Sequence, residues 1–286
     1  MNIALDSSIT SVEFNGSEVD AVEFNGTEVW RKAAPSPAQP DTWEAKSWTG
    51  ILSFIGSNVW TDGTIIYYSA NANQYVIDIS TSSLVTKTWN GLQSFSGEYI
   101  WTDGTDVYYS NDVNQYILDK TTSTWNSKTW SNSPRYFMGS NIWTDGTIIY
   151  YSANANQYVI DISTSSLVTK TWNGLQSFSG EYIWTDGTDI YYSKGTDQYI
   201  LDKSTSTWSP KTWSGLQSFY GNSIWTDGSN IYYSNGSDQY VLDKTTSTWS
   251  LKTWSGLTTF QGRYIWTDGT DIYYSGNANQ YVLVKP

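Results

Sequence analysis

The stretch Trp101-Thr102-Asp103-Gly104 decides the fold, because the same four residue types recur six times along the chain. The copies begin at steps of 41, 42, 41, 41 and 41 residues, at Trp60, Trp101, Trp143, Trp184, Trp225 and Trp266. A period near forty residues is typical of a supersecondary unit that is copied in tandem and buries its apolar face against its neighbours. The sequence therefore predicts a repeat architecture.

Each repeat contains four short runs of β-forming residues. In the second repeat these runs are residues 95–102, 106–110, 115–119 and 125–130, and they are rich in Tyr, Trp, Ile, Val and Thr. Gly, Asn, Asp or Ser separates the runs, and no stretch has the 3.6-residue apolar period of a helix. Four short antiparallel strands in about 41 residues make one propeller blade. We expect an all-β, six-bladed β-propeller with four-stranded blades.

The two ends of the array predict that the ring is closed. The last repeat stops at residues 281–286, after its third strand, and its fourth strand is missing there. Residues 42–48 have the form of that strand, since Trp43, Lys46 and Trp48 align with Trp125, Lys128 and Trp130 of a complete repeat. We expect residues 42–48 to pair with the last three strands. This closure removes open sheet edges that would favour aggregation.

The chain divides into three segments. Residues 1–30 contain two similar runs, 11–19 and 21–29, each with Asn-Gly in its middle, which predicts two small β-hairpins. Residues 31–41 hold three Pro and three Ala and read as a linker. Residues 42–286 form the predicted propeller.

Composition excludes several functions. The net charge of −12 disfavours nucleic acid and anionic membrane, because both require clustered Lys and Arg. The chain has no Cys and no His, so it lacks the residues of most nucleophilic triads. Residues 60–106 and 143–189 are identical, which suits interchangeable blades better than one asymmetric catalytic centre. We expect no enzyme activity, no signal peptide and no membrane-spanning segment.

The repeated Asp of the T-D-G turn is the most obvious set of carboxylates. Its members are Asp62, Asp103, Asp145, Asp186, Asp227 and Asp268. Calcium ligation requires several converging oxygens, whereas Asp beside Gly is typical of a tight turn. We expect a structural role, with no metal and no cofactor. The Trp of the same motif is expected in the core between blades.

Two other sets of residues are candidates for binding. The second Trp of each repeat lies near the end of the outer strand, where it either packs at the rim or stacks on sugar rings. The loop between the second and third strands is rich in Asn and Asp, which either face solvent or contact polar ligands. Arg135 lies in an inter-repeat loop that is one residue longer than its equivalents. The candidate binding residues are Trp89, Asn111, Asp112, Asn114, Trp130, Arg135, Trp172, Asp197, Trp213, Asp238 and Trp254.

The segment from Gln239 to Trp249 resembles the third-to-fourth strand signature of kelch repeats, in which an aromatic strand ends in Asp and a Thr-containing turn leads to Trp. The pattern recurs from Asp119 to Trp125 and from Asp202 to Trp208. Leu84 and Leu167 replace the Trp in two repeats, and the double glycine of kelch repeats is absent. The array is therefore kelch-like without the full signature.

The paired V-E-F-N-G-(S/T)-E-V units of residues 12–19 and 22–29, with Trp30 after the second, resemble segments of bacteriophage tail-associated proteins. The resemblance covers about 20 residues. It implies a virion or prophage component, located in a virion or outside the cell, whose residues 1–30 contact other virion proteins.

Three functional hypotheses remain open. The first is a non-enzymatic virion protein, associated with a tail or fibre, that presents a propeller face to a host-surface glycan or protein. The second is a multivalent, lectin-like propeller with one weak sugar site in each blade. The third and least favoured is a glycan-cleaving enzyme, which would require a unique carboxylate pair. A homo-oligomer is compatible with the sequence.

Overall fold

The structure is a computed structural model of the whole chain. It describes residues 13–14, 17–18, 21–24, 27–31, 41–50, 54, 59–70, 73–92, 95, 99–111, 113–134, 137, 142–153, 156–175, 178, 182–216, 219, 224–235, 238–257, 260, 264–276 and 279–285. The chain divides into two compact units, residues 1–41 with 285–286, and residues 42–284.

The first unit contains two β-hairpins, as predicted. Strand β1 (Glu13–Phe14) pairs with β2 (Ser17–Glu18), and β3 (Ala21–Phe24) pairs with β4 (Thr27–Arg31). An Asn-Gly pair separates the two strands of each hairpin in the sequence, which is the residue pair that tight hairpin turns favour.

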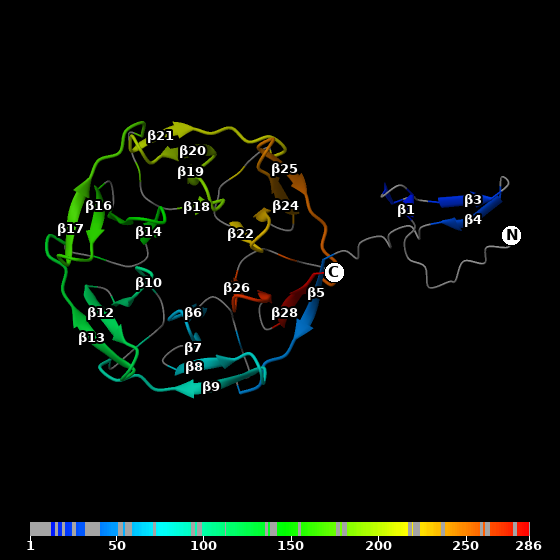
Figure 1. Cartoon of the computed structure of the whole chain (residues 1–286). Coiled ribbons are helices and arrows are strands. Elements are labelled where there is room, and N and C mark those ends of the chain that lie inside the picture. The colour runs from blue at the N-terminus through cyan, green and yellow to red at the C-terminus, as the bar shows by residue number, and fades with distance from the viewer. Residues whose placement is uncertain are drawn as a thin grey trace. The chain divides into compact units, whose positions relative to one another are not determined.

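The second unit is the predicted propeller. Its described residues form six four-stranded antiparallel sheets and no helix. The innermost strands, which lie nearest the centre of the ring in Figure 1, have three residues each: β6 (Val59–Thr61), β10 (Ile100–Thr102), β14 (Ile142–Thr144), β18 (Ile183–Thr185), β22 (Ile224–Thr226) and β26 (Ile265–Thr267). The second strands are β7 (Ile66–Ala70), β11 (Val107–Asn111), β15 (Ile149–Ala153), β19 (Ile190–Lys194), β23 (Ile231–Asn235) and β27 (Ile272–Gly276).

The third and fourth strands complete the blades toward the rim. The third strands are β8 (Asn73–Asp78), β12 (Asn114–Asp119), β16 (Asn156–Asp161), β20 (Asp197–Asp202), β24 (Asp238–Asp243) and β28 (Asn279–Val284). The outer strands are β9 (Ser83–Lys87), β13 (Thr124–Lys128), β17 (Ser166–Lys170), β21 (Thr207–Pro210), β25 (Thr248–Leu251) and β5 (Thr42–Lys46). We number the blades 1 to 6 from the sheet of β6.

Blade 6 is closed by the N-terminal strand of the array, as predicted. Strand β5, which ends at Lys46 rather than at the predicted residue 48, pairs with β28 along its whole length (Figure 1). Leu283 lies opposite Trp43 in this pairing. At the junction between blades 6 and 1, Gln280 Nε2 donates a 2.6 Å hydrogen bond to the carbonyl of Phe54. The first and last parts of the array therefore join the ring by the same contacts that join the other blades.

The core lies between neighbouring blades and consists mainly of aromatic rings. In one cluster, Trp225 and Tyr232 of blade 5 pack against Trp43, Phe260 and Tyr274 of blade 6. Equivalent clusters lie at the other blade junctions. The Trp of the T-D-G motif is thus an inter-blade core residue, as predicted. Each fully buried aromatic side chain removes about 150–250 Å² from water, which explains how such short strands form a stable unit.

Backbone contacts also join the blades. Asn90 N donates to Ser123 O, and Trp125 N donates to Asn90 O, so the segment after one outer strand bridges to the outer strand of the next blade. The following residue, Gly91, has a φ of +82°, and a Cβ atom added there would lie 2.2 Å from the carbonyl oxygen of Trp125. Gly91 is therefore required both by its backbone conformation and by this close approach.

In blade 2, two strand boundaries differ from the predicted ones by two residues or more, and the others differ by at most one residue. The inner strand of blade 2 covers Ile100–Thr102 rather than residues 95–102, and the outer strand ends at Lys128 rather than residue 130. Phe95 leaves the ladder because its ring stacks on Trp125, with ring centroids 5.3 Å apart. Trp130 likewise packs inward, since it is only 5% exposed.

Candidate functional site

One end of the propeller carries two kinds of loop. The antiparallel order of the strands places the turn between the second and third strands at the same end as the segment between blades. In blade 2, Asn111 pairs with Asn114 across this turn, and the neighbouring Ser110 N donates to the carbonyl of Tyr99 at the start of the inner strand. We call this end the loop face. It carries the loops between the second and third strands, which are rich in Asn and Asp.

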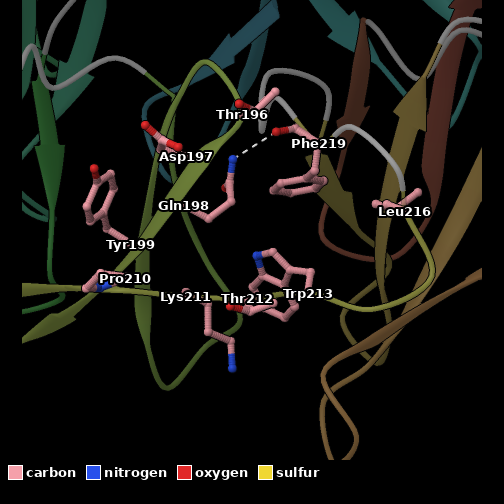
Figure 2. Close-up of a pocket in the computed structure, with 10 residues that line it drawn as sticks. All are labelled: Thr196, Asp197, Gln198, Tyr199, Pro210, Lys211, Thr212, Trp213, Leu216 and Phe219. Carbon is pink, nitrogen blue, oxygen red and sulfur yellow. Dashed lines mark hydrogen bonds between the residues drawn. The ribbon is translucent and has the colours of Figure 1, made fainter.

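A buried glutamine fixes the two kinds of loop to each other. Ser193 Oγ donates a 2.6 Å hydrogen bond to Gln198 Oε1, and Gln198 Nε2 donates a 2.8 Å bond to the carbonyl of Phe219 in the next inter-blade segment (Figure 2). The same pair of bonds occurs in every blade, at Gln74, Gln115, Gln157, Gln198, Gln239 and Gln280. The polar groups of this Gln are therefore used within the protein.

Blade 4 carries a groove on the loop face with a volume of about 460 Å³. The turn residues Thr196 and Asp197 form one side, and Leu216 of the inter-blade segment forms the other (Figure 2). The rest of the lining comes from strands β20 and β21 and the residues after them: Gln198, Tyr199, Pro210, Lys211, Thr212, Trp213 and Phe219. The groove brings together two residues that the sequence proposed separately, Asp197 and Trp213.

The second Trp of each repeat packs at the rim, and a lysine covers its ring. Lys211 Nζ lies 4.7 Å from the ring centroid of Trp213, and it also donates a 2.8 Å hydrogen bond to Ser247 Oγ of the next blade. Tyr191 contacts the same indole, with ring centroids 5.2 Å apart. Trp89, Trp130, Trp172 and Trp254 have the same lysine contact, at 4.6–4.8 Å. A sugar cannot stack on the covered face unless the lysine moves, so these indoles form walls of the site.

The polar candidates of the loops have different surroundings. Asn114, Asp197 and Asp238 are exposed first residues of the third strands, and Asn111 is half-buried. Their carboxylate and amide groups are accessible to a ligand on the loop face. Asp112 and Arg135 lie outside the described residues. Asp238 and Trp254 are the residues of blade 5 that are equivalent to Asp197 and Trp213 of blade 4.

The Asp of the T-D-G turn has the predicted structural role. Asp62 Oδ1 accepts hydrogen bonds from the backbone amides of Thr64 and Ile65 and from the Thr64 hydroxyl, and its Oδ2 accepts one from Tyr67. Burial alone would raise the pKa of Asp62, but these hydrogen bonds outweigh it and hold the pKa below its ordinary value. Burial and the neighbouring carboxylate raise the pKa of Tyr67.

The described part of the chain contains no group of three or more Asp or Glu residues placed to hold a metal ion. The T-D-G carboxylates also lie at the end of the blades opposite the loop face, at the turn between the first and second strands. Among the same described residues, no helix has the length and apolar character needed to cross a membrane.

Comparison with known proteins identifies a fold and no family. No protein-family model and no curated protein matches the chain. One similar solved structure is the extracellular domain of a protein described as the one component system BT4673 of B. thetaiotaomicron, with a TM-score of 0.53, 14% identity and 84% of this chain covered. Two others are the extracellular domains of proteins described as the hybrid two component systems BT4673 and BT3049 of the same organism. They have TM-scores of 0.49 and 0.48, identities of 12% and 13%, and cover 86% and 78% of this chain.

These solved structures are much longer than the present chain, which spans 33%, 34% and 33% of their lengths. At such low identity the first likeness concerns the fold alone. It agrees with the six blades described above: the chain is an all-β propeller.

Proposed function

We propose that the chain is a non-enzymatic binding protein that presents its loop face to a glycan or a protein. The observation that carries the proposal is the groove of blade 4, in which Asp197, Thr196 and Thr212 offer polar groups beside the Trp213 indole. A concave, partly apolar surface with a few convergent polar groups is the usual form of a small-ligand site. The hydrogen bonds of Gln198 hold both sides of this groove in place.

The residue content supports binding rather than catalysis. The chain has no His and no Cys, and Asp197 is the single carboxylate among the described residues that line the groove. Hydrolysis of a glycosidic bond ordinarily requires two carboxylates, one on each side of the scissile bond. A role in binding requires only hydrogen-bonding and apolar contacts, which the groove has.

The repetition of the blades supports multivalent binding. The residues of the groove recur at equivalent places, for example Asp238, Lys252 and Trp254 in blade 5. Several weak sites on one rigid scaffold bind a repetitive surface far more tightly than each site binds alone. A polymeric glycan or a repeated surface protein is such a target, and a lectin-like propeller is the simplest form of this function.

The virion assignment is the more specific part of the proposal. It is supported by the resemblance of residues 11–30 to segments of phage tail-associated proteins, and by the two hairpins that these residues form. In this proposal residues 1–30 attach the chain to other virion proteins, and the propeller faces the host surface. One solved structure with a similar fold is an extracellular domain, which supports a location outside the cell.

An array of immobilised glycans, probed with the full chain, tests the binding function. We expect binding to a subset of glycans, and mass spectrometry of the same glycans in solution should show no products. Asn in place of Asp197 and Asp238 should weaken binding, whereas Glu44→Gln on the exposed outer side of β5 should not. Products would contradict the non-enzymatic proposal, and unchanged binding by the Asp197→Asn, Asp238→Asn variant would exclude the groove as the site.

A further inference from the structure

Alternate blades carry an exposed tyrosine. Tyr99, Tyr182 and Tyr264 are 43%, 49% and 45% exposed, and among the described residues they are the aromatic side chains with the largest exposure. They directly precede the inner strands of blades 2, 4 and 6. The sequence has Asn58, Asn141 and Ser223 at the equivalent places of blades 1, 3 and 5. The six-bladed ring therefore has a three-fold chemical repeat, in agreement with the identical segments 60–106 and 143–189, which lie two repeats apart.

Hydrogen bonds place these tyrosines on the loop face. The carbonyl oxygens of these tyrosines accept 3.2 Å hydrogen bonds from backbone amides of the second strands. The pairs are Ser110 N to Tyr99 O, Ser193 N to Tyr182 O and Ser275 N to Tyr264 O. Each of these serines lies one residue before the end of the second strand, next to the polar turn of its blade. The tyrosines thus lie at the inner edges of the blades, on the same end as the groove.

The backbone at these tyrosines is in the left-handed region, with φ of +53°, +53° and +57°. Bulky side chains rarely adopt this conformation, whereas Asn and Gly tolerate it. The fold would accept Asn here, the residue type that blades 1 and 3 carry in sequence. Tyrosine therefore serves neither the backbone conformation nor the buried core, and strained positions of this kind concentrate at binding sites.

The tyrosines also differ from the tryptophans of the loop face. The second Trp of each repeat has a lysine ammonium within 5 Å of its ring centroid. Other aromatic rings also contact these indoles, as Tyr191 contacts Trp213. None of these indoles is among the large apolar side chains that are strongly exposed in the described residues. Aromatic stacking with a ligand on this face would therefore use tyrosine.

From these observations, and resting on the function proposed above, we propose that Tyr99, Tyr182 and Tyr264 each stack on one ring of a neutral carbohydrate, giving three equivalent sites per chain. The apolar face of a pyranose ring fits against the electron-rich face of an aromatic ring. Asn114, Asp197 and Asn279, which are exposed at the polar turns of the same three blades, suit its hydroxyl groups. The net charge of −12 disfavours acidic glycans. Three small aromatic surfaces separated by polar loops also differ from the contiguous apolar centre of a protein interface.

The test compares the full chain with its Tyr99→Asn, Tyr182→Asn, Tyr264→Asn variant on an array of immobilised neutral and acidic oligosaccharides. Because Asn tolerates the left-handed backbone, the variant should fold with a Tm no lower than that of the original chain. We expect it to lose at least tenfold in apparent affinity, and single substitutions to give intermediate losses. A Val85→Asn, Val168→Asn variant, which removes exposed apolar groups from outer strands β9 and β17, should bind normally.

The outcomes separate this inference from the proposed function. If the tyrosine variant loses binding to neutral glycans and the valine control variant does not, the inference and the proposed function are both supported. Unchanged binding by the tyrosine variant would overturn the inference and leave the proposed binding function standing. Binding by the original chain only to acidic glycans would overturn the assignment to neutral carbohydrate. No binding to any glycan, combined with tyrosine-dependent binding to a purified surface protein, would overturn it in favour of a protein partner.

Discussion

Trp43 lies opposite Leu283 in the sheet of blade 6, although 240 residues separate them in the chain. Both side chains are buried, and Trp43 is only 1% exposed. Its ring contacts Trp225 of blade 5 and Phe260 of blade 6. The pairing thus joins the first strand of the ring to the last, and it makes the stability of the whole propeller depend on strand β5.

Trp43→Ala should destabilise the protein by about 3–5 kcal/mol, because it removes a large buried ring and leaves a cavity between blades. The change in the free energy of unfolding can be measured by urea denaturation. Glu44→Ala is the matched control, since Glu44 is the next residue of β5 and is exposed.

A shortened chain that begins at residue 49 lacks the closing strand, and it should aggregate on size-exclusion chromatography. A monomeric truncation as stable as the full chain would contradict ring closure.

Gly91→Ala and Gly104→Ala should have different effects although both glycines have positive φ, +82° and +92°. At Gly104 the added Cβ meets nothing within 4 Å, so the loss should be about 1–2 kcal/mol of backbone strain. At Gly91 the Cβ would lie 2.2 Å from the Trp125 carbonyl, which also forces the blades apart. Thermal unfolding should show a clearly larger fall in Tm for Gly91→Ala. Equal falls would mean that the contact between blades is not tight.

Asp62→Asn should lower stability at neutral pH by about 1–2 kcal/mol, because hydrogen bonds to a charged acceptor are lost. The folded-state pKa of Asp62 lies below its unfolded value of about 3.9, so the ionised form contributes stability above that pH. This contribution is lost as the pH falls through the folded-state pKa. The difference in unfolding free energy between the two proteins should therefore shrink below about pH 4. A difference that stays constant down to pH 2 would show that the charge has no role.

Gln198→Glu should destabilise blade 4 by about 1–3 kcal/mol, because a carboxylate oxygen replaces the Nε2 group that donates to the Phe219 carbonyl. The same change should loosen the groove and weaken glycan binding. Gln198→Met, which has a similar size and no charge, should have a smaller effect on the unfolding free energy. If Gln198→Glu has the stability of the original chain, the glutamine does not connect the two loops as described.

The repeated sequence predicted most of the fold, since hydrophobic pattern and turn residues act locally in each blade. The period of the T-D-G motif gave six blades, and the alignment of residues 42–48 with 124–130 gave the closing strand. The first Trp of each repeat was correctly expected in the core. These features depend on which residues are apolar and where the chain turns, and both properties are visible in one repeat.

The candidate site was harder to predict because it depends on contacts between blades. The cover that Lys211 forms over Trp213 has a sequence signal, a Lys two residues before each second Trp, but only the structure shows the ammonium above the ring. The buried role of Gln198 depends on the Phe219 carbonyl, 21 residues later in the chain. The left-handed conformation of Tyr182 has no signal in its residue type, because tyrosine usually avoids it.

The most direct test of the binding face is a crystal structure of the full chain soaked with a neutral oligosaccharide selected on the glycan array. We expect electron density for sugar rings on the loop face, against Tyr99, Tyr182 and Tyr264, with the nearest polar contacts from the turns between the second and third strands. Sugar density at the opposite end of the propeller, beside the T-D-G turns, with none on the loop face, would contradict the proposed binding face.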